Sequence, residues 1–185
     1  MSDVKRISAP LTDDDIKNLK AGDRVIIDGK VLTGRDAAHK RLVELIDKGE
    51  DLPVDLKGQI IYYVGPTPTK PGDVIGAAGP TTSGRMDAYT PQVLKEGVKA
   101  IIGKGARSQA VKDSLKENNA VYLAAIGGAA AKIKDSIKSC DIIAYEDLGP
   151  EAIRHLEVDE FPVVVVNDAY GNDLYEKGRE EYEVK

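Results

Sequence analysis

Short runs of apolar residues alternate with amphipathic segments through the second half of the chain. A short apolar run bounded by turn residues is typical of a buried strand, whereas apolar residues three and four positions apart indicate a helix. Strands are therefore expected at Val98–Ile102, Val121–Ile126, Asp141–Tyr145 and Phe161–Asn167, with helices at 108–117, 128–138 and 150–156 between them. This alternation predicts a sheet with helices packed against it.

The first half of the chain is richer in strand signals and less regular. Thr12 and Asp15 have the spacing of a capping box, which predicts a helix that ends near Lys20. The segment Arg24–Leu32 predicts two short strands joined by a tight turn, because Asp28-Gly29 near its centre is a strong hairpin signal.

Further helix and loop signals lead to the middle of the chain. A helix is expected after Arg35, running to about Lys48 and stopping at Gly49. A strand is expected at Gln59–Val64, and the prolines that follow it predict a loop, since proline cannot continue a strand ladder. No repeat, linker or low-complexity segment interrupts the sequence, so residues 1–185 are expected to form a single α/β domain.

Composition and charge narrow the class of protein. The chain has 42% hydrophobic and 31% charged residues, an ordinary profile for a soluble globular protein. No apolar run approaches the roughly 20 residues of a membrane span, and the N-terminus lacks the apolar core of a signal peptide, so a cytoplasmic protein is expected. With a net charge of -5, no tryptophan and no basic patch, neither nucleic acid nor a membrane is an expected partner.

The cysteine and histidine content argues against a metal site built by this chain alone. Cys140 is the one cysteine, which excludes an internal disulfide and a self-contained iron–sulfur cluster. The two histidines, His39 and His155, are far apart and belong to no paired spacing that would favour zinc.

The densest group of functional side chains lies between Gly79 and Asp87. It combines two glycines, three hydroxyl residues and Arg85, and glycines let the backbone approach a ligand closely while a guanidinium matches a carboxylate. The spacing of Gly79 and Gly84 also mimics a P-loop, but Arg85-Met86 stand where that motif needs Lys-Ser/Thr. A capped turn with an exposed arginine is the simpler alternative.

Two more cationic residues stand at glycine-flanked ends of predicted elements. Arg35 heads the helix after Gly34, and His39 follows one turn later, with a structural role and an active-site role equally open. Lys104 lies between two glycines at a strand end, where ligands commonly bind in α/β sheets. Three such cations suggest a small dicarboxylate as ligand.

Four ordered motifs together resemble a known family over about Leu11 to Tyr175: TGRDAAHKR (33–41), GPTTSGRMDAYTP (79–91), GKGARS (103–108) and AAIGGAAA (124–131). They are similar to the beta subunit of class I, iron–sulfur fumarate hydratase and L-tartrate dehydratase, and to the C-terminal domain of single-chain class I fumarases. The resemblance implies a swivelling three-layer β/β/α fold and a hydro-lyase that converts fumarate to L-malate, with tartrate or a mesaconate-type compound as the next choice of substrate. It also implies a [4Fe–4S] cluster bound by a separate alpha subunit in a hetero-oligomer.

The same resemblance implies roles for individual residues. Thr81 corresponds to the catalytic base, and four residues to the substrate-binding set: Arg35, Thr82, Arg85 and Lys104. Asp87 is expected to orient Arg85. A threonine base needs an activating neighbour, because its hydroxyl pKa is high, and that neighbour would come from the partner subunit. A non-catalytic dicarboxylate-binding module is the alternative from another class.

Overall fold

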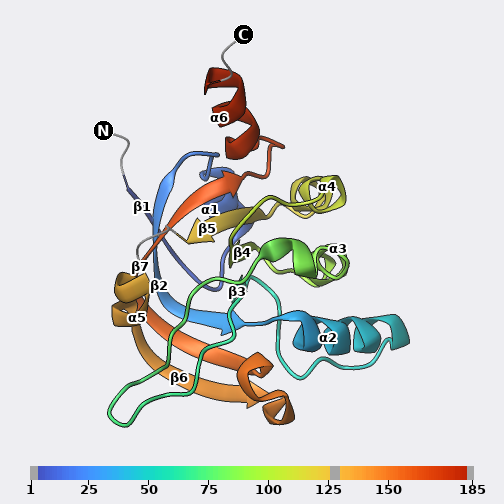
Figure 1. The fold of residues 1–185 in the computed structure, drawn as a ribbon. Helices are drawn as coiled ribbons and strands as arrows, with labels where there is room; N and C mark the ends of the chain where they lie inside the picture. The colour runs from blue at the N-terminus through green and yellow to red at the C-terminus, as the bar shows by residue number, and fades with distance from the viewer. Residues whose placement is uncertain (1–3, 126–129, 183–185) are drawn as a thin grey trace.

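A computed structural model describes residues 4–125 and 130–182 of the chain (Figure 1). The strands are β1 (Lys5–Ser8), β2 (Arg24–Thr33), β3 (Ile60–Tyr62), β4 (Ala100–Gly103), β5 (Val121–Ala125), β6 (Ile137–Ala144) and β7 (Ile153–Asn167). The α-helices are α1 (Asp13–Lys17), α2 (Asp36–Lys48), α3 (Thr90–Lys95), α4 (Gln109–Glu117), α5 (Ala130–Ser136) and α6 (Leu174–Tyr182). Two 3-10 turns, η1 (Ser83–Met86) and η2 (Glu146–Glu151), complete the described elements.

The strands form one sheet that closes on itself. β2, β3, β4 and β5 are parallel neighbours, and β7 runs antiparallel to both β5 and β2, which closes a five-stranded barrel. β1 pairs with the first half of β2, and β6 pairs with the first half of β7, so both extend the sheet outside the barrel. Closure satisfies backbone groups that an open edge would leave unpaired.

The barrel strands are apolar on both faces, because each face packs against a different core. Side chains alternate across a strand: Ile60 and Tyr62 of β3 belong to the core inside the barrel, whereas Ile61 and Tyr63 belong to a second core on its outside. The second core also contains apolar residues of α2, α3 and α4, which lie stacked along one side of the barrel (Figure 1). Burial on both faces is what a parallel sheet covered by helices requires.

Most of the local signals in the sequence are confirmed. Thr12 and Asp15 form the expected capping box at α1, and Gly49 ends α2 in a left-handed conformation. Ser108 caps α4 with its side chain. The mixed α/β class is confirmed, while the swivelling three-layer arrangement stays a prediction. Residues 126–129 lie outside the described residues. They include the end of the strand expected at Val121–Ile126, the start of the helix expected at 128–138, and part of the AAIGGAAA motif.

The hairpin expected at Asp28-Gly29 is wrong, since Arg24–Thr33 is one continuous strand. Gly29 does have a positive φ of 88°, but it lies at a shift of register between β2 and β7. The Asp28 carboxylate accepts hydrogen bonds from the backbone of Glu160 and from Arg6, which lowers its pKa. The dipeptide therefore bends a long strand instead of reversing the chain.

The helix expected at 150–156 is also wrong. Residues 146–151 form the turn η2, and β7 begins at Ile153. The first half of β7 is paired on both sides, with β2 and with β6, and this tertiary pairing overrides the local helical pattern. The helix expected at 128–138 stops early, because β6 already begins at Ile137.

No helix in residues 4–125 and 130–182 has the length and apolar character needed to cross a membrane.

Candidate functional site

The candidate site lies where the parallel strands β2, β3 and β4 end. Arg35 follows β2 by two residues, and Lys104 directly follows β4. The loop before α3 returns to the same edge, because the backbone N–H of Thr81 donates to the carbonyl of Tyr63 at 2.7 Å. Carboxyl ends of parallel strands meet at one edge of a sheet, so these separate motifs share one region.

The loop that carries Thr81 and Thr82 is bonded to the end of β4 as well. Thr82 and Lys104 form an isolated parallel bridge, and the N–H of Ser83 donates to the carbonyl of Lys104 at 2.9 Å. Thr82 and Lys104 are exposed, and Thr81 is half-buried. The expected base and two of the expected substrate ligands are thus carried on neighbouring backbone segments.

Ser83 connects this loop to the barrel. Its side chain is fully buried, and its Oγ lies 2.8 Å from the hydroxyl of Tyr122, which donates to the carbonyl of Gly105. A Cβ added to Gly103 would lie 1.9 Å from the Ser83 Oγ. The loop can therefore sit this close to β4 because position 103 has no side chain.

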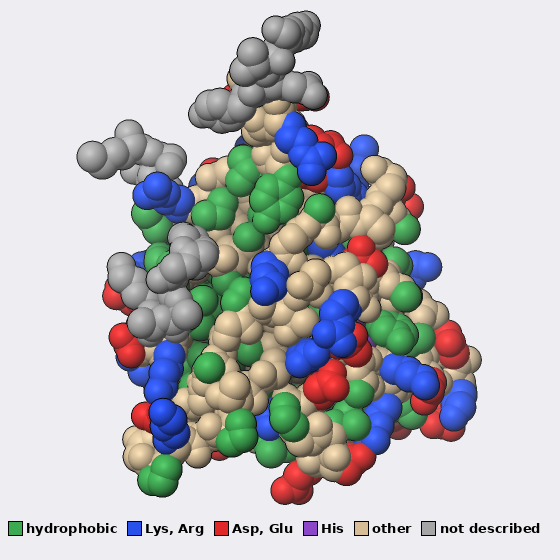
Figure 2. All heavy atoms as spheres, in the orientation of Figure 1, with side chains coloured by type: hydrophobic (Ala, Val, Ile, Leu, Met, Phe, Trp, Pro, Cys, Tyr) green, Lys and Arg blue, Asp and Glu red, His purple; other side chains and the backbone are tan. Residues whose placement is uncertain are grey.

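Arg35 and Arg85 are brought together by one carboxylate. The Arg85 Nε donates to the Asp36 Oδ1 at 3.0 Å, and the Arg35 Nη2 lies 3.5 Å from the Asp36 Oδ2. Figure 2 shows Lys and Arg side chains beside Asp and Glu side chains over the region where α2 begins. The two arginines that are expected to bind substrate carboxylates therefore lie beside the same residue, although they are 50 residues apart in the sequence.

Asp87 has a different partner from the one expected. It forms no hydrogen bond or ion pair with Arg85; its Oδ1 accepts from the Arg107 Nε at 2.8 Å, and its Oδ2 accepts from the backbone N–H of Ser108 at 2.7 Å. Asp87 thus joins the loop before α3 to the first turn of α4. The expected pairing of Asp87 with Arg85 is wrong, because the Arg85 Nε donates to Asp36 instead.

Arg107 is the residue of this site that sequence reasoning missed. Its side chain is completely buried, lies against the rings of Tyr63 and Tyr122, and donates to the Thr90 Oγ1 at 2.9 Å. Nearby charge and hydrogen bonding raise its pKa despite the cost of burial. The signal was present, because Arg107 belongs to the GKGARS motif and directly precedes the Ser108 cap.

His39 has a structural position under the site. It is buried, and its Nδ1–H donates to the carbonyl of Arg35 at 2.8 Å, which stabilises the first turn of α2. The His39 ring also meets the Tyr63 ring edge to face, with centroids 5.2 Å apart. Burial lowers the His39 pKa to about 4, so the imidazole is neutral at pH 7.

The described residues do not form a ligand set for a metal cluster. No group of three or more His, Cys, Asp or Glu side chains gathers within residues 4–125 and 130–182. Cys140 lies on β6 opposite Leu156 of β7, and burial raises the pKa of its thiol. This position is outside the motifs that surround Thr81 and Lys104.

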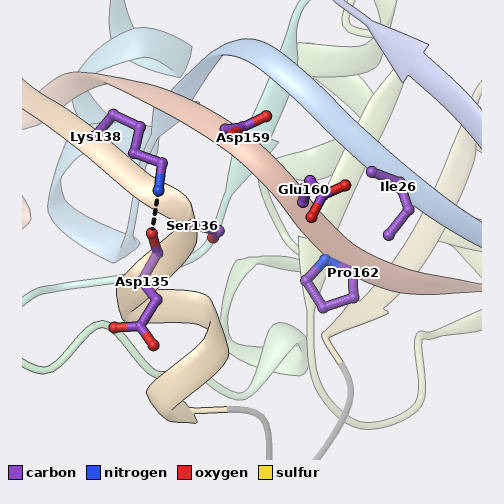
Figure 3. Close-up of a pocket in the computed structure, with 7 residues that line it drawn as sticks. All are labelled: Ile26, Asp135, Ser136, Lys138, Asp159, Glu160 and Pro162. Atoms are coloured by element: carbon purple, nitrogen blue, oxygen red, sulfur yellow. Dashed lines mark hydrogen bonds between the residues drawn. The ribbon is translucent and has the colours of Figure 1, made fainter.

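A cavity elsewhere on the molecule has the wrong charge for an anion. It has a volume of about 420 Å³ and lies between α5, β2 and β7. Figure 3 shows the side chains of Asp135, Asp159 and Glu160 around it, and the Lys138 Nζ already donates to the backbone carbonyl of Asp135. This acidic lining would repel a dicarboxylate, in contrast to the cationic edge of the barrel.

Comparison with known proteins gives one consistent result. The family model described as "Fumarase C-terminus" matches residues 2–178. The "Fumarate hydratase class I, aerobic" of Escherichia coli (strain K12) is 44% identical over 83% of this chain, and the "Fumarate hydratase 2" of Leishmania major is 44% identical over 84%. In both cases the match covers 28% of the relative, so the chain spans under a third of those proteins.

A further relative has a length close to that of this chain. The Methanocaldococcus jannaschii protein named "Putative L(+)-tartrate dehydratase subunit beta" is 41% identical over 90% of this chain and 89% of its own length.

We predict that His39 makes the fold sensitive to mild acid. Its pKa is near 6.5 when unfolded and about 4 when folded, so the unfolded chain binds more protons between these values and stability rises with pH across that window. Replacing His39 with Gln should flatten this rise by about 3 kcal/mol, measured by urea unfolding from pH 4 to pH 7. Parallel curves for the two proteins would contradict the assignment. His155→Gln serves as the control and should change the slope less, because His155 is only half-buried whereas His39 is fully buried.

We also predict that Asp87 is more important for stability than an exposed acidic partner of arginine. Asp87→Ala leaves the buried Arg107 guanidinium without its counter-charge, and should lower the free energy of unfolding by about 3–5 kcal/mol. Asp147→Ala removes an exposed partner of Arg41 and should lower the free energy of unfolding far less, because water screens that pair. Equal losses for the two variants in chemical denaturation would contradict the prediction that the buried pair is more important for stability than the exposed one.

Proposed function

Because this chain belongs to the fumarase C-terminus family, we propose that it is the beta component of an iron–sulfur-dependent hydro-lyase that reversibly adds water to fumarate to give L-malate. One observation carries the proposal: the cationic residues Arg35, Arg85 and Lys104 lie with two threonines at one edge of the barrel. A dicarboxylate needs cations at both ends, and a hydroxyl-bearing loop between them can reach its central carbons.

The proposed roles follow from chemical type and position. Arg35 and Arg85 bind the substrate carboxylates, because a guanidinium forms paired hydrogen bonds with a carboxylate. Lys104 and Thr82, joined through their backbones, complete the substrate contacts. Removing a proton from carbon next to a carboxylate places negative charge on that carboxylate, and a fixed cation there stabilises the transition state.

Thr81 is proposed as the group that exchanges a proton with the substrate carbon. Its backbone is fixed by the bond to Tyr63, so its side chain has a defined origin. A threonine hydroxyl requires activation to act as a base. The activating group is proposed to come from a partner subunit.

A separate alpha subunit is proposed as that partner and as the holder of the [4Fe–4S] cluster. The fumarate hydratases similar to this chain are much longer than it is, whereas the relative of similar length is named a beta subunit. The residues of this chain do not fit a cluster, because Cys140 is its one cysteine and lies on β6. The name of the same relative makes L-tartrate the second candidate substrate.

Reconstitution tests the proposal. The chain co-purified with a cluster-bearing alpha subunit should interconvert fumarate and L-malate, followed by the absorbance of fumarate, while either subunit alone should be inactive. Turnover by the isolated chain without iron would contradict the proposal. Conversion of L-tartrate in preference to fumarate would select the second candidate.

Thr81→Ala in the reconstituted enzyme should lower kcat by about 10²–10⁴, the usual contribution of a positioned acid or base. Fumarate binding should change little, because the arginines remain in place. Thr69→Ala provides the matched control, since Thr69 is an exposed threonine in the preceding loop. Full activity of the Thr81 variant would remove the residue from the reaction, and equal losses in both variants would indicate a general effect on the loop.

A further inference from the structure

Asp36 contacts both arginines that are proposed to bind the substrate. Its Oδ1 accepts from the Arg85 Nε at 3.0 Å, and its Oδ2 lies 3.5 Å from the Arg35 Nη2. An arginine has five N–H donors, and the bond to Asp36 uses the one on Nε of Arg85. The two terminal nitrogens of Arg85, which can form paired hydrogen bonds with a carboxylate, have no hydrogen bond to the described residues, and the side chain is 55% exposed.

The two arginines depend on Asp36 to different degrees. Arg35 is also held by packing, because its side chain lies against Gly65, where an added Cβ would come within 2.8 Å of the Arg35 Nη1. Its Nε additionally lies 3.8 Å from the Glu151 carboxylate. Arg85 extends from the short turn η1, and among the described residues its side chain bonds to Asp36 alone. Loss of Asp36 would therefore mainly release Arg85.

Asp36 itself is well fixed. It is the first residue of α2, where the helix dipole favours a negative charge. The residue before it, Arg35, has its carbonyl bound by both the backbone N–H and the Nδ1–H of His39. A carboxylate between two guanidinium groups also offsets their mutual repulsion, which would otherwise push them apart.

We propose that Asp36 is a positioning residue that sets the spacing and orientation of Arg35 and Arg85 for the two carboxylates of one dicarboxylate. The inference rests on the proposed function and deepens it, because it assigns the discrimination of a diacid from a monoacid to a residue that does not touch the substrate. Asp36 acts through Arg85, and its effect belongs to binding more than to proton transfer.

Asp36→Asn tests this in the reconstituted enzyme. The amide keeps the shape of the side chain and removes the charge, so KM for fumarate should rise about tenfold or more, while kcat changes less than about threefold. Asp36→Glu restores the charge one methylene further out and should recover part of the loss. A purely structural role would instead lower the melting temperature and the active fraction, with KM unchanged, and this result would overturn the proposal.

A double-mutant cycle shows whether Asp36 acts through Arg85. Arg85→Ala should raise KM by itself, and adding Asp36→Asn to it should raise KM by no more than about twofold further. Effects that multiply in full would overturn the proposal. Asp147→Asn is the matched control. It neutralises the partner of Arg41, which lies on the same helix as Asp36, and should leave KM unchanged.

Binding of succinate separates this inference from the proposed function. Succinate is a dicarboxylate without a double bond, so calorimetry reports its binding to the complex whether or not the enzyme turns over. The wild-type complex should bind succinate more tightly than butyrate, and Asp36→Asn should reduce that preference about tenfold.

If the wild type binds succinate but does not hydrate fumarate, the proposed function fails, and the effect of Asp36→Asn on succinate still decides the inference. A wild type that neither binds succinate nor hydrates fumarate would overturn both, and an unchanged preference in the variant would overturn the inference alone.

Discussion

The pairing of β7 with both β2 and β5 is the constraint on which the rest of this structure depends. Without it, the four parallel strands would form an open sheet with free edges and a core exposed on one side. Closure fixes the tilt and stagger of the strands, so the ends of β2, β3 and β4 are held at one rim. The three motifs that carry Arg35, Thr81 and Lys104 leave the barrel at this rim, and the site is therefore a product of the barrel geometry.

A buried polar layer lies between the barrel and the exposed site. Tyr63 accepts the N–H of Thr81 through its carbonyl, and its ring contacts both His39 and Arg107. Burying a charged pair such as Arg107 with Asp87 contributes little net stability on average, because desolvation offsets the attraction. Such a pair can still favour one arrangement over others. Here it joins the loop that carries Thr81 and Thr82 to the N-cap of α4.

The sequence predicts the features that depend on neighbouring residues. The Thr12 capping box, the left-handed Gly49 and the Ser108 cap all follow from contacts within one turn of chain, and the structure confirms each of them. The sequence does not predict the strand at Asp28-Gly29 because its partner β7 comes from a distant segment. It does not predict the strand that begins at Ile153 because the partners of that strand, β2 and β6, are set by the fold. For the candidate site, the sequence identified cations and threonines that the structure places at one edge. It could not identify Asp36 as the partner of Arg85 or Asp87 as the partner of Arg107, since carboxylates of the same type occur throughout the chain and only the fold selects among them.

Gly103 shows that a glycine can be required for a reason unrelated to chain reversal. It is the last residue of β4 and has a φ outside the left-handed region, so the backbone itself would accept alanine. The obstacle is the Ser83 hydroxyl, which fills the volume where the first side-chain carbon would stand. Any larger residue at position 103 would displace the Ser83 hydroxyl from its contact with Tyr122, which anchors the loop that carries Thr81 and Thr82, while the barrel stayed intact. Under the proposed function, loss of activity without loss of fold is the evolutionary signature to expect there.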